Sequence, residues 1–260
     1  MTERKIDFMK TDLFHIGKFV IHGYGLMIGI GYVLALLVGE YRAKKMGMKE
    51  EALIDIAIIA GVSGFLGAKL LYIIVSFKDF IEDPIGVLGS SGFVVYGGLI
   101  AGVLCNLIYV KIKKLSFLEY FDLVMPEIAL AQGFGRIGCF LAGCCYGRET
   151  DSWFSITFTH SDFAPNGVKL LPTQLMSSAG DFLICGLLLL YAGRKPKEGQ
   201  VAAGYMVLYG IGRFIIEFFR NDYRGSIGVL STSQIISIGV VAAGVVFYLV
   251  MNRRERSVGN

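Results

Sequence analysis

Residues 230–251, LSTSQIISIGVVAAGVVFYLVM, form an uncharged, mainly apolar run that decides the fold class. A helix needs about 20 such residues to cross the hydrocarbon layer of a bilayer. Comparable runs recur along the whole chain, and we place seven of them at 19–41, 52–76, 93–110, 117–141, 174–192, 200–219 and 230–251. The sequence therefore predicts an all-α, polytopic membrane protein with about seven transmembrane helices and small periplasmic or extracellular loops.

The composition favours the same class. Of the 260 residues, 54% are hydrophobic and 18% are charged, which is too apolar for an ordinary soluble domain. Because the connections are short, we predict one integral membrane domain over residues 1–260. Residues 1–18 carry charges throughout, so we expect a surface arm rather than a cleaved signal peptide. The longest connection, 143–173, is expected to be an external loop region.

Clusters of three or four basic residues follow every odd-numbered apolar run, whereas the connections after even-numbered runs contain no such cluster. The clusters are Arg42, Lys44, Lys45 and Lys49; Lys111, Lys113 and Lys114; Arg194, Lys195 and Lys197; and Arg253, Arg254 and Arg256. By the positive-inside rule, the C-terminus is cytoplasmic and, with seven spans, the N-terminus lies outside. Because the clusters are separated by spans and share no face, nucleic acid is not an expected partner.

Ionisable residues inside apolar runs are the main functional signal. Each costs at least about 2.5 kcal/mol at the bilayer centre and therefore tends to face a cavity or a partner. Tyr209, Arg213 and Glu217 recur every fourth residue, which places them on one stripe of a helix. With Arg136 in another run, we predict two arginines that bind one anionic headgroup. The alternatives are that Glu217 only neutralises Arg213, or that the arginines reach surface water or carboxylates.

The stretch GRIGCFLAGCCYGR, residues 135–148, combines glycines with three of the five cysteines. We expect its helix to end near Gly143. Small packed residues are the first interpretation of these three cysteines, a disulfide the second, and metal or redox chemistry the third, because the Cys-x-x-Cys spacing of zinc sites is absent. Cysteines elsewhere in apolar runs are expected in the core. The clustered cysteines are Cys139, Cys144 and Cys145, and the others are Cys105 and Cys185.

Five motifs follow one another along the chain: HGYGLM at 22–27, YGGLIAG at 96–102, GRIGCFLAGCCYGR at 135–148, LPTQL at 171–175 and YGIGRFIIEFFRND at 209–222. Together they resemble the prolipoprotein diacylglyceryl transferase family. The resemblance covers essentially the whole chain. It implies a bacterial inner-membrane enzyme that uses no metal or cofactor. Such an enzyme transfers the diacylglyceryl group of phosphatidylglycerol to the lipobox cysteine thiol of a prolipoprotein and releases glycerol 1-phosphate.

The resemblance also assigns roles to individual positions. It implies that Arg136 and Arg213 contact the lipid phosphate and that Tyr24 and Tyr209 supply essential polar groups. It also implies that Glu217 is a partner of Arg213 and that Gly147 makes a required tight turn. Lys69 matches a basic residue in the family's second span.

Several positions depart from the family pattern. Tyr96 replaces a histidine, Cys139 an asparagine, and the three positions Ala142, Cys144 and Ser177 replace other polar residues. Both Tyr96 and Cys139 are candidate site residues: Tyr96 as a thiol-activating group and Cys139 as a substrate contact. Either Tyr96 accepts the substrate proton with a lowered pKa, or the proton passes to water or phosphate, or the activity has changed. The alternative functions are transfer to another acceptor, non-catalytic anion or lipid binding and, as the weakest, thiol redox chemistry.

Overall fold

A computed structural model describes residues 12–16, 19–90, 92–222 and 226–254. Within these ranges the chain is mainly helical, and each predicted apolar run corresponds to one long helix. The long helices are α1 (Gly23–Met46), α2 (Glu50–Val75), α5 (Val95–Ile112), α6 (Phe117–Ala142), α7 (Thr173–Ala192), α8 (Gln200–Glu217) and α9 (Thr232–Arg254). Two short helices, α3 (Phe77–Glu82) and α4 (Pro84–Gly89), lie between α2 and α5 in the chain.

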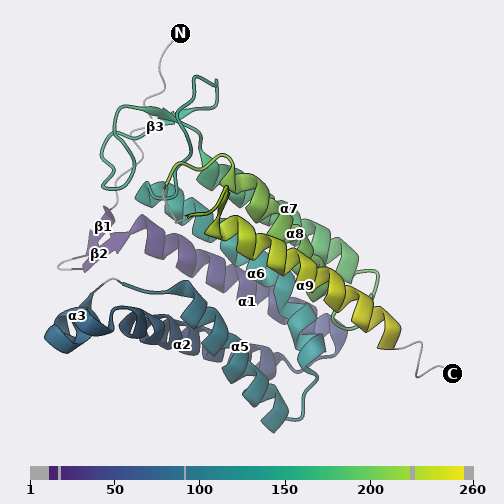
Figure 1. The fold of residues 1–260 in the computed structure, drawn as a ribbon. Coiled ribbons are helices and arrows are strands. Elements are labelled where there is room, and N and C mark those ends of the chain that lie inside the picture. The colour runs from purple at the N-terminus through teal and green to yellow at the C-terminus, as the bar shows by residue number, and fades with distance from the viewer. Residues whose placement is uncertain (1–11, 17–18, 91, 223–225, 255–260) are drawn as a thin grey trace. The chain divides into compact units, whose positions relative to one another are not determined.

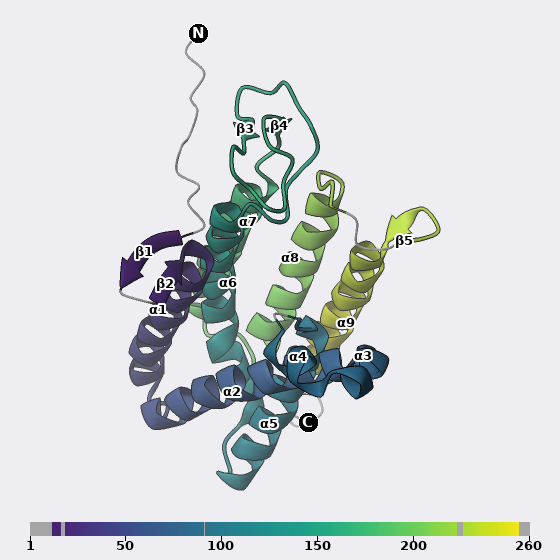
Figure 2. The same ribbon diagram turned by 90° about the vertical axis from the view of Figure 1, so that its left-hand side faces the viewer.

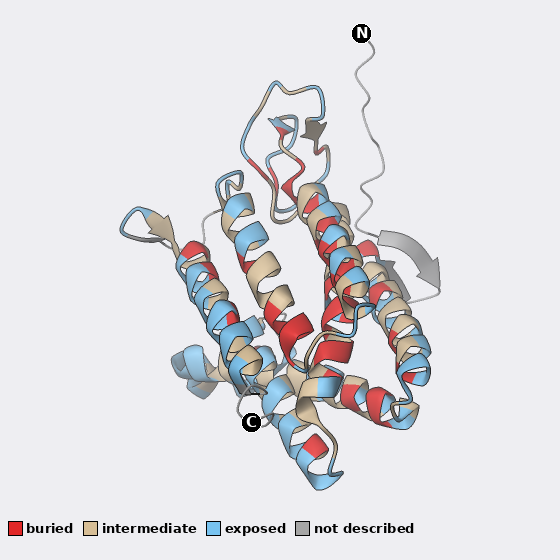
Figure 3. Cartoon of the chain, turned by 90° about the vertical axis from the view of Figure 1, so that its right-hand side faces the viewer, coloured by how far each residue is buried: buried red, intermediate tan, exposed pale blue. Residues whose placement is uncertain are grey.

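Five of the long helices, α1, α2, α5, α7 and α9, are long and apolar enough to cross a membrane. Their large apolar side chains are widely exposed, as is typical of surfaces that face lipid, and Figure 3 shows the exposed stretches in pale blue. The chain is therefore a polytopic membrane protein, as predicted. Helices α6 and α8 carry the charged residues discussed below, and their crossing of the membrane stays a prediction.

The strands form three short antiparallel hairpins. They pair β1 (Asp12–Ile16) with β2 (Phe19–His22), β3 (Ile156–Thr157) with β4 (Lys169–Leu170), and β5 (Ser226–Ile227) with β6 (Leu230–Ser231). Most of the predicted surface arm, residues 1–18, lies outside the described residues, and its described part is strand β1. Strands β3 and β4 belong to the predicted loop region 143–173, which extends beyond the ends of α6 and α7 in Figure 2.

The chain divides into two compact units, residues 1–38 with 121–260, and residues 39–120. The single domain predicted over residues 1–260 stays a prediction. In the first unit, α8 packs against both α7 and α9 (Figure 1). A buried core joins α6, α7 and α8 through Ala129, Ile184, Cys185, Leu188 and Val201. The expected core position is thus confirmed for Cys185, whereas Cys105 in α5 is only partly buried.

A carboxylate from α6 caps the N-terminus of α8. The side chain of Asp122 accepts hydrogen bonds from the backbone N–H groups of Gly199, at 2.6 Å, and Ala202, at 2.8 Å. These N–H groups have no carbonyl partner within their own helix, and the helix dipole favours a negative charge beside them. All three residues are buried. Asp122 therefore has a structural role in this unit.

We expect Asp122→Ala to lower the free energy of unfolding by about 2 kcal/mol, because it leaves two buried N–H groups without an acceptor. Thermal or denaturant unfolding in detergent micelles measures this loss. Glu119→Ala is the control, since Glu119 lies in the same helix but is exposed; its effect should stay within about 0.5 kcal/mol. Equal stability of the two variants would contradict the capping role.

In the second unit, small residues let α2 and α5 pack closely. A methyl group on Gly98 would lie 2.7 Å from the carbonyl oxygen of Gly64, so the close approach of the two helices requires glycine at this position. Lys69 of α2 donates a hydrogen bond to the carbonyl oxygen of Ser90, at 2.7 Å, and its Nζ lies 5.0 Å from the ring centroid of Phe93. Lys69 thus holds the segment that leads into α5.

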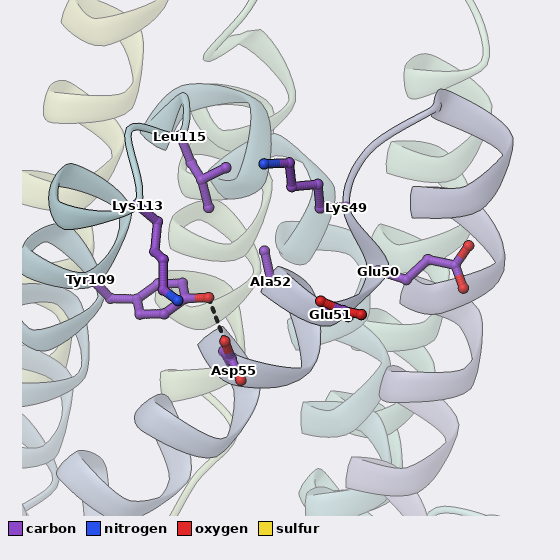
Figure 4. A pocket seen from close by; sticks show the side chains of 8 residues that line it. All are labelled: Lys49, Glu50, Glu51, Ala52, Asp55, Tyr109, Lys113 and Leu115. Atoms are coloured by element: carbon purple, nitrogen blue, oxygen red, sulfur yellow. Dashed lines mark hydrogen bonds between the residues drawn. The ribbon is translucent and has the colours of Figure 1, made fainter.

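The second unit also contains a polar cavity of about 600 Å³ (Figure 4). It is lined by Lys49, Glu50, Glu51, Ala52, Asp55, Tyr109, Lys113 and Leu115. The hydroxyl of Tyr109 donates a hydrogen bond to Oδ2 of Asp55, at 2.5 Å. None of the predicted site residues is among the residues that line this cavity.

Candidate anion-binding site

Arg136 of α6 has no hydrogen bond or ion pair to any part of the chain that the structure describes. Its electrostatic neighbours are led by Tyr209 and include Cys139, Asp181 and Cys145. A guanidinium group keeps its charge at any physiological pH and presents a planar fork of N–H donors. Arg136 therefore has donors available for an incoming anion.

Arg213 of α8 is held from two sides. Its Nη1 lies 2.5 Å from Oε2 of Glu217, and its Nη2 donates to the hydroxyl of Ser233 in α9, at 2.9 Å. The side chains of Arg213 and Glu217 are 12% and 8% exposed. The ion pair expected from the spacing of four residues is thus present. Because Ser233 holds the second nitrogen, the orientation of the guanidinium plane is fixed.

Tyr209 lies in the electrostatic neighbourhood of both arginines. Its ring stacks on that of Tyr205, with centroids 5.5 Å apart and planes 12° from parallel. The hydroxyl of Tyr205 in turn donates to Oε1 of Gln132 in α6, at 2.8 Å. Tyr205 therefore links the Tyr209 ring, which is stacked on it, to α6, the helix that carries Arg136.

Tyr24 in the first turn of α1 belongs to the same neighbourhood. Its electrostatic neighbours include Cys139 and Arg136. A methyl group on Gly138 would lie 3.1 Å from the carbonyl oxygen of Tyr24, so the glycine permits a close approach of α1 to α6. The first unit therefore brings Tyr24 to the same region as Arg136.

Tyr96 lies in the first turn of α5, in the second unit, and is 50% exposed. The other candidate residues belong to the first unit, and the contacts described for them do not involve Tyr96. The role of Tyr96 as a thiol-activating group therefore stays a prediction.

Helix α6 ends where the sequence predicts. Gly143 has φ +72°, in the left-handed region. Its N–H donates to the carbonyl of Phe140, and the N–H of Cys144 donates to that of Cys139, both at 3.1 Å. This pair of hydrogen bonds is the Schellman motif, which satisfies the last carbonyls of a helix and turns the chain.

The chain after this turn is anchored to the start of α7. The hydroxyl of Thr173 donates to the carbonyl of Cys145, at 2.8 Å, and Nε2 of Gln174 donates to that of Cys144, at 2.7 Å. Thr173 and Gln174 are each only 1% exposed. Two buried side chains thus fix the backbone of the vicinal cysteines.

The turn that the resemblance assigns to Gly147 is made by other residues. The left-handed conformations fall on Gly143 and Cys145, with φ +72° and +63°. Gly147 instead donates its N–H to the carbonyl of Leu171, at 3.1 Å, and a methyl group on it would lie 2.6 Å from that oxygen. Gly147 is therefore needed for close backbone approach.

The five cysteines are thiols. The sulfur atoms of Cys139, Cys144 and Cys145 all lie within 4.8 Å of one another. Hydrogen bonds with the Cys139 and Cys144 thiols, together with the positive charge of Arg220, lower the pKa of the Cys145 thiol. The helix end thus gathers three thiols beside an arginine.

Sequence reasoning overlooked three residues of this region. Asp181 of α7 is buried near Arg136, and as an ionisable residue inside an apolar run it gave the same signal as the arginines. Arg220 follows α8 and forms a bidentate pair with Asp222, at 2.8 and 2.6 Å. Ser233 gave no signal, because serine is common in apolar helices.

The fold and this region define a class of protein: a polytopic, helical membrane protein with arginines on two helices that have one tyrosine, Tyr209, as a common electrostatic neighbour. Residues 11–250 match the prolipoprotein diacylglyceryl transferase family. The chain therefore belongs to this family, as the sequence motifs indicated.

The similarity to individual relatives extends over almost the whole chain. The chain is 44% identical to the phosphatidylglycerol-prolipoprotein diacylglyceryl transferase of Clostridium tetani, over 95% of this chain and 100% of the relative. It is 46% identical to phosphatidylglycerol-prolipoprotein diacylglyceryl transferase 2 of Clostridium perfringens, over 95% and 98%. It is 34% identical to the phosphatidylglycerol-prolipoprotein diacylglyceryl transferase of Clostridioides difficile, over 90% of this chain and 92% of the relative.

Proposed function

We propose that this protein transfers the diacylglyceryl group of phosphatidylglycerol to the lipobox cysteine of a prolipoprotein and releases glycerol 1-phosphate. Family membership and the names of the relatives support the reaction. The observation that carries it is Arg136, whose guanidinium has no hydrogen-bonding partner in the described structure and shares Tyr209 as a neighbour with Arg213. Phosphatidylglycerol offers a single phosphate anion, which matches the planar donors of arginine.

In the proposed reaction, the substrate sulfur attacks the carbon of the diacylglyceryl group that is bonded to the phosphate oxygen. A carbon–sulfur bond forms, the carbon–oxygen bond to the phosphate breaks, and the thiol proton passes to the departing phosphate or to a base. Negative charge grows on the departing oxygen in the transition state. Arg136 and Arg213 stabilise this charge in a site of low dielectric constant. The family resemblance implies that this reaction uses no cofactor or metal.

Each remaining candidate has a defined part in this proposal. Tyr209 and Tyr24 supply hydroxyl groups beside Arg136, while Glu217 orients Arg213 through their ion pair. Cys139 lies one helical turn beyond Arg136 and contacts the substrate. Tyr96 is the proposed thiol-activating residue, and Gly147 keeps the chain after α6 close to α7.

The proposed location is the bacterial cytoplasmic membrane, with the N-terminus outside and the C-terminus in the cytoplasm. The basic clusters after odd-numbered helices support this orientation. Both arginines then lie toward the outer face, where the lipid and the prolipoprotein signal peptide would meet them. Reporter fusions to the C-terminus and to the loop 143–173 test the orientation, and a periplasm-dependent phosphatase should be active only in the loop.

The reaction is tested with purified protein in phosphatidylglycerol liposomes and a lipobox peptide. Mass spectrometry should detect a diacylglyceryl adduct on the peptide together with released glycerol phosphate. A peptide with serine at the lipobox position is the control and should stay unmodified. Release of glycerol phosphate without peptide modification would replace the proposal with transfer to another acceptor, and the absence of both products would overturn it.

A further inference from the structure

We propose that Cys139, Cys144 and Cys145 form a binding site for one soft d10 metal cation of the Zn²⁺ class. This site does not depend on the proposed transferase reaction, although it uses Cys139, which the proposed function also places in contact with the substrate. Thiolate sulfur is a soft ligand that favours Zn²⁺ and Cu⁺ over Mg²⁺ and Ca²⁺. The chemistry of the three side chains therefore defines the class of ligand.

The fold brings the three thiols together although their spacing in sequence matches no common metal motif. Cys139 lies in the last turn of α6, and the Schellman turn at Gly143 reverses the chain directly after the helix. The left-handed conformation of Cys145, with φ +63°, completes the reversal. The chain at Cys144 and Cys145 thus turns back toward Cys139, and the three sulfur atoms lie close to one another.

The distances fit a metal of this class. The three sulfur atoms lie within 4.8 Å of one another. Zinc–sulfur bonds of about 2.3 Å in tetrahedral geometry place the sulfurs about 3.8 Å apart. Closing that difference requires only small rotations about the side-chain torsions of three short residues. Three protein ligands leave a fourth position for water, as in zinc sites that keep an open coordination position.

The backbone of the site is held in place without a metal. Thr173 and Gln174 donate to the carbonyls of Cys145 and Cys144 from buried positions at the start of α7. Two of the three ligands therefore lose little conformational freedom when they bind, which lowers the cost of binding.

The charges around the cluster also favour a metal thiolate. Three thiolates and one divalent cation carry a net charge of about −1. The guanidinium of Arg220 lies against Cys145, and Arg136 has Cys139 and Cys145 among its electrostatic neighbours. Arg220 is only 4% exposed and is held by Asp222. These cations compensate the thiolates, as outer-shell partners do in metal sites.

The test uses the full chain in detergent micelles, purified under reducing, oxygen-free conditions. Zn²⁺ binding is measured by competition with a chromophoric chelator, and Cd²⁺ binding by the sulfur-to-cadmium charge-transfer band. We expect one metal ion per chain in the wild type. Cys144→Ser and Cys145→Ser should each weaken Zn²⁺ binding by about 10- to 100-fold and reduce the Cd²⁺ band.

Two cysteines outside the cluster provide matched controls. Cys105→Ser, in the second unit, and Cys185→Ala, in the core of the first, should bind Zn²⁺ as the wild type does. Thermal unfolding identifies variants that fail to fold, and Cys139→Ala then tests the remaining ligand. Three results would overturn the proposal: no metal bound to the reduced wild type, equal binding by the cluster and control variants, or a native disulfide whose reduction leaves a protein that binds no metal.

Discussion

Arg136→Lys should lower the rate of diacylglyceryl transfer by about 100- to 1000-fold. Lysine keeps the positive charge but loses the planar fork that binds two phosphate oxygens at once. Hydrogen bonds to charged groups contribute about 1.5–3 kcal/mol each, so losing the bidentate geometry at the transition state accounts for about 3–4 kcal/mol. Initial rates at saturating lipobox peptide, in liposomes of fixed phosphatidylglycerol content, measure the effect.

The matched control is Arg148→Lys, the same substitution at an exposed arginine of the loop after α6. It should retain the wild-type rate within about twofold, since surface charges contribute little. Arg136→Lys should also unfold at the wild-type temperature, because Arg136 has no hydrogen bond or ion pair within the described ranges. Wild-type transfer by Arg136→Lys would remove this residue from the phosphate site.

The helices were predictable because each long apolar run has one favourable structure in a bilayer. The run 200–219 gave α8 over Gln200–Glu217, and the run 117–141 gave α6 over Phe117–Ala142. The start of α1 was less accurate. Residues 19–22 are as apolar as the helix that follows, but they pair with Asp12–Ile16 as strand β2. Hydropathy alone does not distinguish a short strand from the first turn of a helix.

The site was predictable where its geometry is local. The spacing of four residues gave the Arg213–Glu217 pair, since such residues are neighbours on any helix. Ser233 was not predictable, because its contact with Arg213 depends on how α9 packs against α8. The sequence placed the three clustered cysteines close together in the chain, but it ranked packing first and did not predict that the three sulfur atoms meet. Their convergence depends on a positive φ at Cys145, a conformation that a residue other than glycine adopts uncommonly.

Arg213→Lys should lower transfer by about 100-fold, and Glu217→Gln by about tenfold. We expect a smaller effect at Glu217 because it is a positioning residue that acts through Arg213. Glutamine still accepts a hydrogen bond from the guanidinium but removes the charge that fixes it. Loss of orientation should therefore lower kcat more than it raises KM for the lipid.

The double variant separates this positioning role from a purely structural one. If Glu217 acts through the guanidinium, Glu217→Gln should cost little further activity once Arg213 is lysine, which corresponds to a coupling energy of about 1–2 kcal/mol. Ser233→Ala, which removes the other contact of Arg213, should reproduce the loss of kcat more weakly. Independent, multiplicative losses in the double variant would show that Glu217 does not act through Arg213. The ion pair between them would then have no part in orienting the guanidinium for phosphate binding.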